Sequence, residues 1–166
     1  KEQKQAAAQA KPLSTKYVLA VTLGILGVVL LFALLLPRLI LQYYKLRYRK
    51  AAADKEKSYW AYRAATYYLH MCGINRGTKT PMQFARETID PLFGTSFTGF
   101  MNIYLKKKYA NQPLTASEQN IVSGFLLPFL AAVRKNTGFK TTFLGFINPL
   151  RCIGFYMVPE EDEKEN

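Results

Sequence analysis

The side chains with the greatest chemical potential in this sequence are His70 and Cys72, which lie two positions apart. An imidazole beside a thiol can generate the thiolate nucleophile of a cysteine hydrolase. The stretch before Cys72 contains no Gly or Pro from Ala51 to Met71, and we interpret it as a helix. Residues two apart on a helix point about 200° away from each other, so the pair should not meet. We interpret Cys72 as a small buried residue at a helix end, and a hydrolase using Cys72 is the weakest alternative.

Other catalytic or metal-binding arrangements are not indicated. His70 is the only histidine, and with the distant Cys72 and Cys152 it supplies too few ligands at the wrong spacing for a metal. Two cysteines are too few for a disulfide scaffold, and in a cytoplasmic domain both should be free thiols. No glycine-rich phosphate loop follows a predicted strand. We therefore predict no catalytic residue, cofactor or metal in this fragment, and interpret its carboxylates as caps and solvated groups: Asp54, Glu56, Glu87, Asp90 and Glu118.

Positive charge is the dominant chemical feature. The 166 residues include 23 Lys and Arg against 11 Asp and Glu, which gives a net charge of +12. Such a balance favours anionic partners, either lipid head groups or nucleic acid. Nucleic-acid binding is the rival interpretation, because tyrosines interleave with the cations, but we do not expect it beside a membrane span. The candidate contacts for lipid or a protein partner are Arg38, Lys45, Arg47, Arg49, Lys50, Lys106, Lys107 and Lys108.

A membrane helix should position the first of these cations. Tyr17 to Leu36 is free of charged side chains, and such a helix of twenty residues spans about 30 Å, the thickness of the bilayer's apolar layer. We predict a transmembrane helix over residues 17–41. A buried soluble helix and a signal peptide are the alternatives, but the basic, aromatic chain after Pro37 favours an anchor. Ala20 and Gly24 form a weak motif for helix association.

The flanking charges predict the orientation. Seven Lys and Arg follow the span up to Lys57, against four before it, which predicts that the C-terminal side lies in the cytoplasm. Residues 42–58 form a basic juxtamembrane segment in this interpretation. Tyr43, Tyr44 and Tyr48 within it should lie in the head-group layer.

The region 59–135 should form an all-α domain of about four helices. Gly73 should end the first helix. Thr80 and Gln83 form a capping box for a second helix, which Asp90–Pro91 should end. The last two helices are predicted over Phe97 to Tyr109, by apolar spacing, and from the capping box of Thr115 and Glu118 to residues 136–138, with a kink at Pro128.

The remaining segments are less regular. Residues 1–16 read as a linker from an upstream domain, because the chain lacks an initiator methionine and this stretch has no apolar face. Residues 136–158 are apolar but interrupted by Gly and Pro. They should either lie at the membrane interface or pack on the helical domain. Residues 159–166 form an acidic tail.

Three ordered motifs resemble a known family. Tyr59–Arg63 with Cys72–Ile74, then Lys79–Arg86, then Tyr109–Glu118 are similar to the uncharacterised cytoplasmic C-terminal domain of bacterial transglutaminase-like multi-pass membrane proteins. The resemblance covers roughly residues 59–133. It implies an upstream extracytoplasmic domain with a Cys-His-Asp triad, a last membrane helix and this domain, so none of the triad falls in this chain. We expect a non-catalytic membrane anchor and cytoplasmic interaction module, with the bilayer and an unidentified protein as partners.

Overall fold

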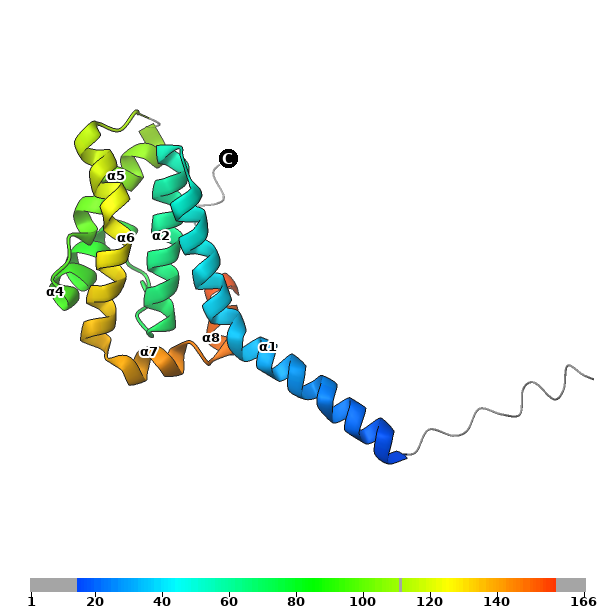
Figure 1. Ribbon diagram of the computed structural model, residues 1–166. Helices are drawn as coiled ribbons and strands as arrows, with labels where there is room; N and C mark the ends of the chain where they lie inside the picture. Colours follow the sequence, from blue (N-terminus) through cyan, green and yellow to red (C-terminus); the bar gives the residue numbers. More distant parts are fainter. Residues whose placement is uncertain (1–14, 111, 158–166) are drawn as a thin grey trace, which may run out of the picture. The chain divides into compact units, whose positions relative to one another are not determined.

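The computed structural model describes residues 15–110 and 112–157, and these divide into two compact units with the boundary after Ala33. All of the regular structure in these ranges is helical and no strand is present (Figure 1). The all-α fold class, with one long apolar helix followed by a helical domain, is confirmed.

The first unit contains the start of α1, which runs from Thr15 to Lys50. Its large apolar side chains from Tyr17 to Phe32 are exposed, and no side chain of its most apolar window is buried. A core helix of a soluble protein would be mostly buried. Among the described residues, α1 is the one helix whose length and composition suit a membrane span.

The second unit begins with the end of α1, which is part of the domain core. Pro37, Leu41, Tyr44 and Tyr48 are buried at helical spacing. Tyr44 packs edge-on against the ring of Tyr67 at 5.6 Å, and the Tyr48 hydroxyl donates to the carbonyl of Val122 at 2.9 Å. The prediction that Tyr44 and Tyr48 lie in the head-group layer is therefore wrong, because protein side chains bury both rings. Tyr43 remains half exposed.

Helix α2 (Asp54–Met71) lies at the centre of this unit and packs on α5 (Phe97–Ala110) and α6 (Ala116–Thr137), as Figure 1 shows. Ala61, Ala64 and Ala65 on α2 are fully buried, and their small side chains let the neighbouring helices approach closely. After α2, Gly73 adopts a φ of 85°, as expected of a residue that ends a helix. Stacked aromatic pairs fill the core, with ring centroids 4.4 Å apart for Tyr62–Tyr104 and 4.0 Å apart for Phe100–Phe125.

Both predicted capping boxes are present, before α6 and before α3 (Pro81–Phe84). The predicted end at Asp90–Pro91 is wrong. A π-helical segment (η2, Ala85–Ile89) leads into α4 (Asp90–Phe93), which ends at Gly94 with a φ of 60°. Pro91 is tolerated in the first turn of α4. The Asp90 carboxylate instead accepts the backbone N–H groups of Phe97 and Thr98 at the start of α5.

Two further helices extend the domain beyond the predicted limit of residue 135: α7 (Phe139–Gly145) and α8 (Pro149–Met157). One face of this segment packs on the domain. A side chain at Gly145 would overlap the Met71 carbonyl, and the Arg151 guanidinium donates to that same carbonyl at 3.0 Å. The structure therefore agrees with the alternative that residues 136–157 pack on the helical domain. The other face leaves several apolar side chains exposed: Phe139, Leu144, Leu150, Ile153 and Met157.

Candidate functional site

A groove of about 780 Å³ lies between the second half of α1, the end of α6 and α7. Its floor includes the buried side chains of Leu41, Tyr68, Leu130 and Phe146. Four cations from two helices line it, and no lining residue carries a carboxylate. We call it the basic groove, and its cations are Arg38, Lys45, Arg134 and Lys135.

Local sequence explains where these cations lie. Arg38 and Lys45 are seven residues apart on α1, which places them on one helix face together with Leu41. Arg134 and Lys135 lie in the last turn of α6, where the helix dipole favours positive charge.

Aromatic rings hold the two guanidinium groups of the basic groove. Arg38 lies 5.2 Å from the ring centroid of Phe143, and Arg134 lies 6.0 Å from that of Phe139. The two rings themselves stack, 5.6 Å apart. A cation over a ring keeps its hydrogen-bond donors free for an anion, unlike a cation paired with a carboxylate. Within residues 15–110 and 112–157, no carboxylate forms an ion pair with any of the four cations.

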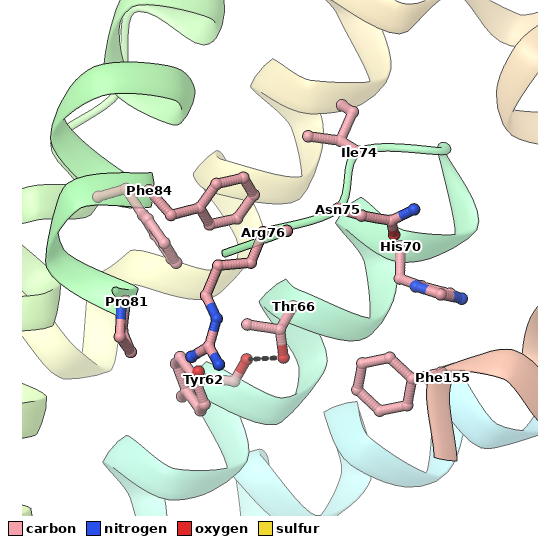
Figure 2. A pocket seen from close by; sticks show the side chains of 11 residues that line it. Tyr62, Thr66, His70, Ile74, Asn75, Arg76, Pro81, Phe84 and Phe155 are labelled. Atoms are coloured by element: carbon pink, nitrogen blue, oxygen red, sulfur yellow. Dashed lines mark hydrogen bonds between the residues drawn. The ribbon is translucent and has the colours of Figure 1, made fainter. Parts of the chain in front are cut away.

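The structure gives His70 and Cys72 separate partners, in line with the expectation that they do not meet. The Nε2 atom of His70 donates to the carbonyl of Arg151 at 2.9 Å, and its ring lies beside Phe155 in a second cavity (Figure 2). Cys72 lies near the Thr142 hydroxyl, at 4.0 Å. Burial raises the pKa of the Cys72 thiol, which disfavours the thiolate. No group of metal-binding side chains occurs among the described residues, and both cysteines are free.

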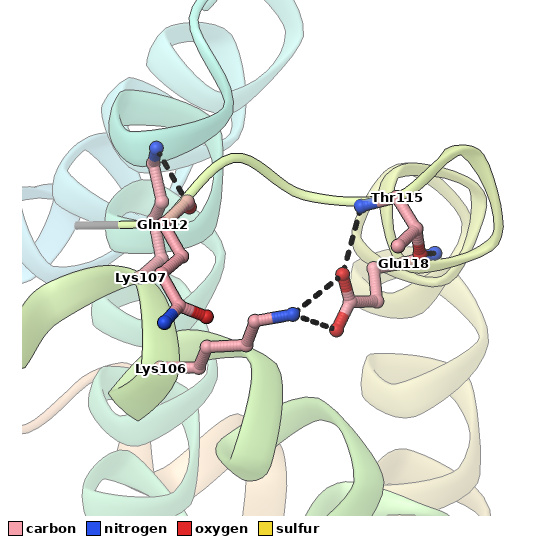
Figure 3. A network of polar contacts seen from close by, with 5 residues as sticks. All are labelled: Lys106, Lys107, Gln112, Thr115 and Glu118. Carbon is pink, nitrogen blue, oxygen red and sulfur yellow. Dashed lines mark hydrogen bonds and ion pairs between the residues drawn. The ribbon is translucent and has the colours of Figure 1, made fainter. Parts of the chain in front are cut away.

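The predicted cations outside the basic groove differ in their surroundings. Lys106 binds the Glu118 carboxylate at 2.8 Å, and Lys107 donates to the carbonyl of Gln112 at 3.1 Å (Figure 3). Lys108 lies 5.1 Å from the centroid of the Tyr109 ring. We call Lys106, Lys107 and Lys108 the lysine cluster.

The carboxylate in the lysine cluster is well held. The hydrogen bond from Lys106 and that from the Thr115 N–H together lower the pKa of Glu118.

At the end of α1, Arg47 pairs with Glu56 at 3.2 Å, whereas Arg49 and Lys50 are exposed. Of the eight predicted contact residues, the groove therefore brings together only Arg38 and Lys45.

Sequence reasoning missed Arg134 and Lys135. Their signal was the pair of adjacent cations in the last turn before Gly138. That pair alone indicates only a favourable interaction with the helix dipole. The position of Arg134 and Lys135 in the groove, opposite α1, depends on how α7 packs.

The comparisons with known proteins found no match: no protein-family model, no curated protein and no solved structure is similar to this chain. The resemblance to the transglutaminase-like membrane proteins therefore stays a prediction.

Proposed function

We propose that this chain is a membrane-anchored helical module whose basic groove binds an anionic phospholipid. The observation that carries the proposal is the combination of four cations, an apolar floor and no lining carboxylate. A lipid offers both chemistries at once, because its phosphate is anionic and its acyl chains are apolar.

The two kinds of cation have different roles in the proposal. The planar guanidinium groups of Arg38 and Arg134 donate paired hydrogen bonds to phosphate oxygens. Lys45 and Lys135 add point charge that draws the head group in. Leu41 and the rings of Tyr68 and Phe146, which also line the groove, give an acyl chain an apolar surface.

The position of the groove in the sequence supports a lipid rather than a soluble ligand. Arg38 follows the charge-free stretch ending at Leu36 by only two residues, and α1 continues without a break through Lys50. Basic pockets beside membrane helices are a common way to hold anionic lipid head groups. The excess of Lys and Arg after the span favours the cytoplasmic leaflet as the source.

The proposal also covers the cellular location of the chain, the protein that it belongs to and its lack of catalytic activity. We infer a bacterial membrane location with the helical domain in the cytoplasm, a role as the C-terminal part of a transglutaminase-like protein, and a non-catalytic function. The charge asymmetry and the ordered motifs support these parts. An interaction with a second protein is the alternative, and the exposed apolar side chains of α7 and α8 support it.

The test uses the full chain, purified in a mild detergent and offered phosphatidylglycerol or phosphatidylcholine with identical acyl chains. Native mass spectrometry counts the lipids that remain bound. We expect preferential retention of phosphatidylglycerol, which weakens at high salt. Replacing the four groove cations with glutamine should reduce its retention about a thousandfold, at roughly 1 kcal/mol per cation.

The matched control removes four positive charges outside the groove. It combines Arg49→Gln, Lys50→Gln, Lys107→Gln and Lys108→Gln in one chain. This variant should retain phosphatidylglycerol as the unaltered chain does. Equal retention of the two lipids, or equal loss in both variants, would show that the groove is not a specific lipid site.

A further inference from the structure

Helices α7 and α8 expose large apolar side chains that line neither the basic groove nor the cavity beside His70. We call these side chains the apolar patch: Leu144 on α7, and Leu150, Ile153 and Met157 on α8. Residues 150, 153 and 157 are spaced at i, i+3 and i+7, so they share one side of α8. Leu150 and Met157 are each 75% exposed, whereas Cys152 is buried. One side of α8 therefore packs on the domain, and the other is left open.

Both helices lie beside the part of α1 that directly follows its charge-free stretch. On α7, the ring centroid of Phe143 lies 5.2 Å from the guanidinium of Arg38. On α8, Sγ of Cys152 lies 3.4 Å from the Tyr67 hydroxyl, which itself bonds the Pro37 carbonyl at 3.0 Å. Figure 1 shows α7 and α8 at the end of the helical domain where α2 and α6 finish. Because a membrane helix leaves the apolar layer where charged residues begin, a bilayer around α1 would end at the level of α7 and α8.

The charges near the apolar patch also suit a bilayer surface. Residues 119–157 contain no Asp or Glu, and their charged side chains are Arg134, Lys135, Lys140 and Arg151. Anionic head groups attract such a segment and would repel carboxylates. Amphipathic helices that combine cations with large apolar side chains lie in the plane of the membrane interface. The patch therefore has the composition of an interfacial segment.

We propose that the apolar patch docks on the surface of the same bilayer that α1 spans, with its side chains inserted at the boundary between head groups and acyl chains. This inference rests on the proposed membrane anchor but not on lipid binding by the basic groove. The anchor keeps the patch next to the bilayer at a high effective concentration, so a weak intrinsic affinity is enough. Docking holds the basic groove, which α7 lines, at the level of the head groups.

The experiment uses the full chain in phosphatidylcholine nanodiscs, in which a fraction of the lipids carries bromine on the acyl chains. Bromine quenches tryptophan fluorescence on contact. Trp60, the only tryptophan, is first replaced by phenylalanine, and single tryptophans are then introduced. Leu150→Trp reports on the apolar patch. Ile121→Trp is the matched control, because Ile121 is also exposed but lies about 24 Å along α6 from the end that leads into α7.

We expect bromine to remove about half of the fluorescence of Leu150→Trp and little of that of Ile121→Trp, since an interfacial helix lies roughly 5–10 Å deep. Adding Leu144→Glu to the Leu150→Trp chain should reduce the quenching about twofold, because a buried charge is costly. Leu92→Glu should leave it unchanged, although Leu92 on α4 is 56% exposed and Leu144 is 58% exposed. Circular dichroism checks that each variant is folded.

Leu26→Trp, within the charge-free stretch, separates this inference from the membrane anchor. Quenching of Leu26→Trp without quenching of Leu150→Trp would leave the anchor intact and overturn docking. If neither is quenched, both proposals fail. Protection of Leu150→Trp from bromine and also from the soluble quencher acrylamide would assign the patch to a second copy of the chain instead. Because phosphatidylcholine has no net charge, the outcome is independent of phosphatidylglycerol retention by the basic groove.

Discussion

The basic groove and the lysine cluster are similar in composition but differ in what surrounds their charges. Each combines cations with aromatic rings. In the lysine cluster, Glu118 lies 2.8 Å from Lys106, and its position is fixed by the capping box at the start of α6. In the groove, rings rather than carboxylates lie beside Arg38 and Arg134.

Charge density along a sequence therefore does not indicate which cations can bind an external anion. That depends on whether the fold brings a carboxylate to them. An internal ion pair occupies donors that would otherwise meet a phosphate, although an exposed pair adds little to stability. Four substitutions change one side of this comparison at a time.

Gly145→Ala should break the wall of the groove without touching the lysine cluster. The new methyl group would overlap the Met71 carbonyl, so α7 has to move away from α2. We expect a loss of about 3 kcal/mol in the free energy of unfolding. Chemical denaturation of the detergent-solubilised chain, followed by fluorescence, measures it. Gly154→Ala is the matched control, because a methyl group added there would lie 3.8 Å from its nearest neighbour, Nε2 of His70. Equal stability of the two variants would argue against the tight contact between α7 and α2.

Ala131→Glu should make the groove resemble the lysine cluster. Ala131 is exposed, lines the groove and precedes Arg134 and Lys135 by three and four residues on α6. A glutamate there can pair with both cations. Because one carboxylate cancels one unit of positive charge, we expect about a fivefold loss of phosphatidylglycerol retention, at roughly 1 kcal/mol. Ala131→Gln controls for size, and a similar loss in that variant would point to shape instead of charge.

Tyr67→Phe should weaken the attachment of α1, which forms one wall of the groove. The buried Tyr67 hydroxyl donates to the Pro37 carbonyl at 3.0 Å, and we expect its removal to cost about 1 kcal/mol. Tyr43→Phe, at an exposed ring, should be neutral.

The stabilisation by the Tyr67 hydroxyl should depend on pH in a defined direction. Burial, with the bond to Cys152, raises the pKa of Tyr67 above its ordinary value of 10.0. The advantage of the unaltered chain over Tyr67→Phe should therefore be constant below pH 10 and shrink above it, as the unfolded chain ionises. An advantage that persists unchanged at higher pH would contradict this assignment.

Glu118→Gln should have the smallest effect, because it removes the charge from the lysine cluster but leaves a side chain that can still cap. Since the pKa of Glu118 is lowered from 4.5, its stabilising contribution is complete above pH 4.5 and declines as the pH falls. The variant should be slightly less stable at neutral pH and should match the unaltered chain in acid. Thermal unfolding at several pH values measures the difference. Glu87→Gln, whose partner Lys79 is 3.6 Å away and exposed, should show no such trend.

The sequence predicted helices well wherever local signals agreed. Capping boxes at Thr80 and Thr115, and the glycine after α2, are local hydrogen-bonding and backbone preferences, so they are readable without a fold. The prediction at Asp90 was wrong because Asp-Pro is compatible with the first turn of a new helix as well as with the end of an old one.

The candidate site was less predictable than the helices. Arg38 and Lys45 were identified from charge and position, whereas Arg134 and Lys135 were missed and six other cations proved to lie outside the groove. Tyrosines beside cations suggested the head-group layer, but burial of Tyr44 and Tyr48 depends on α2 and α6, which are distant in the sequence.

The apolar length of α1, the all-helical fold and most helix ends could be predicted from the sequence, because they follow from the periodicity and capping of neighbouring residues. Which cations lie beside a carboxylate and which line the groove depends on tertiary packing, and so does the second cavity beside His70 and Phe155. Both outcomes require side chains from helices far apart in the chain, and their packing has no local signature.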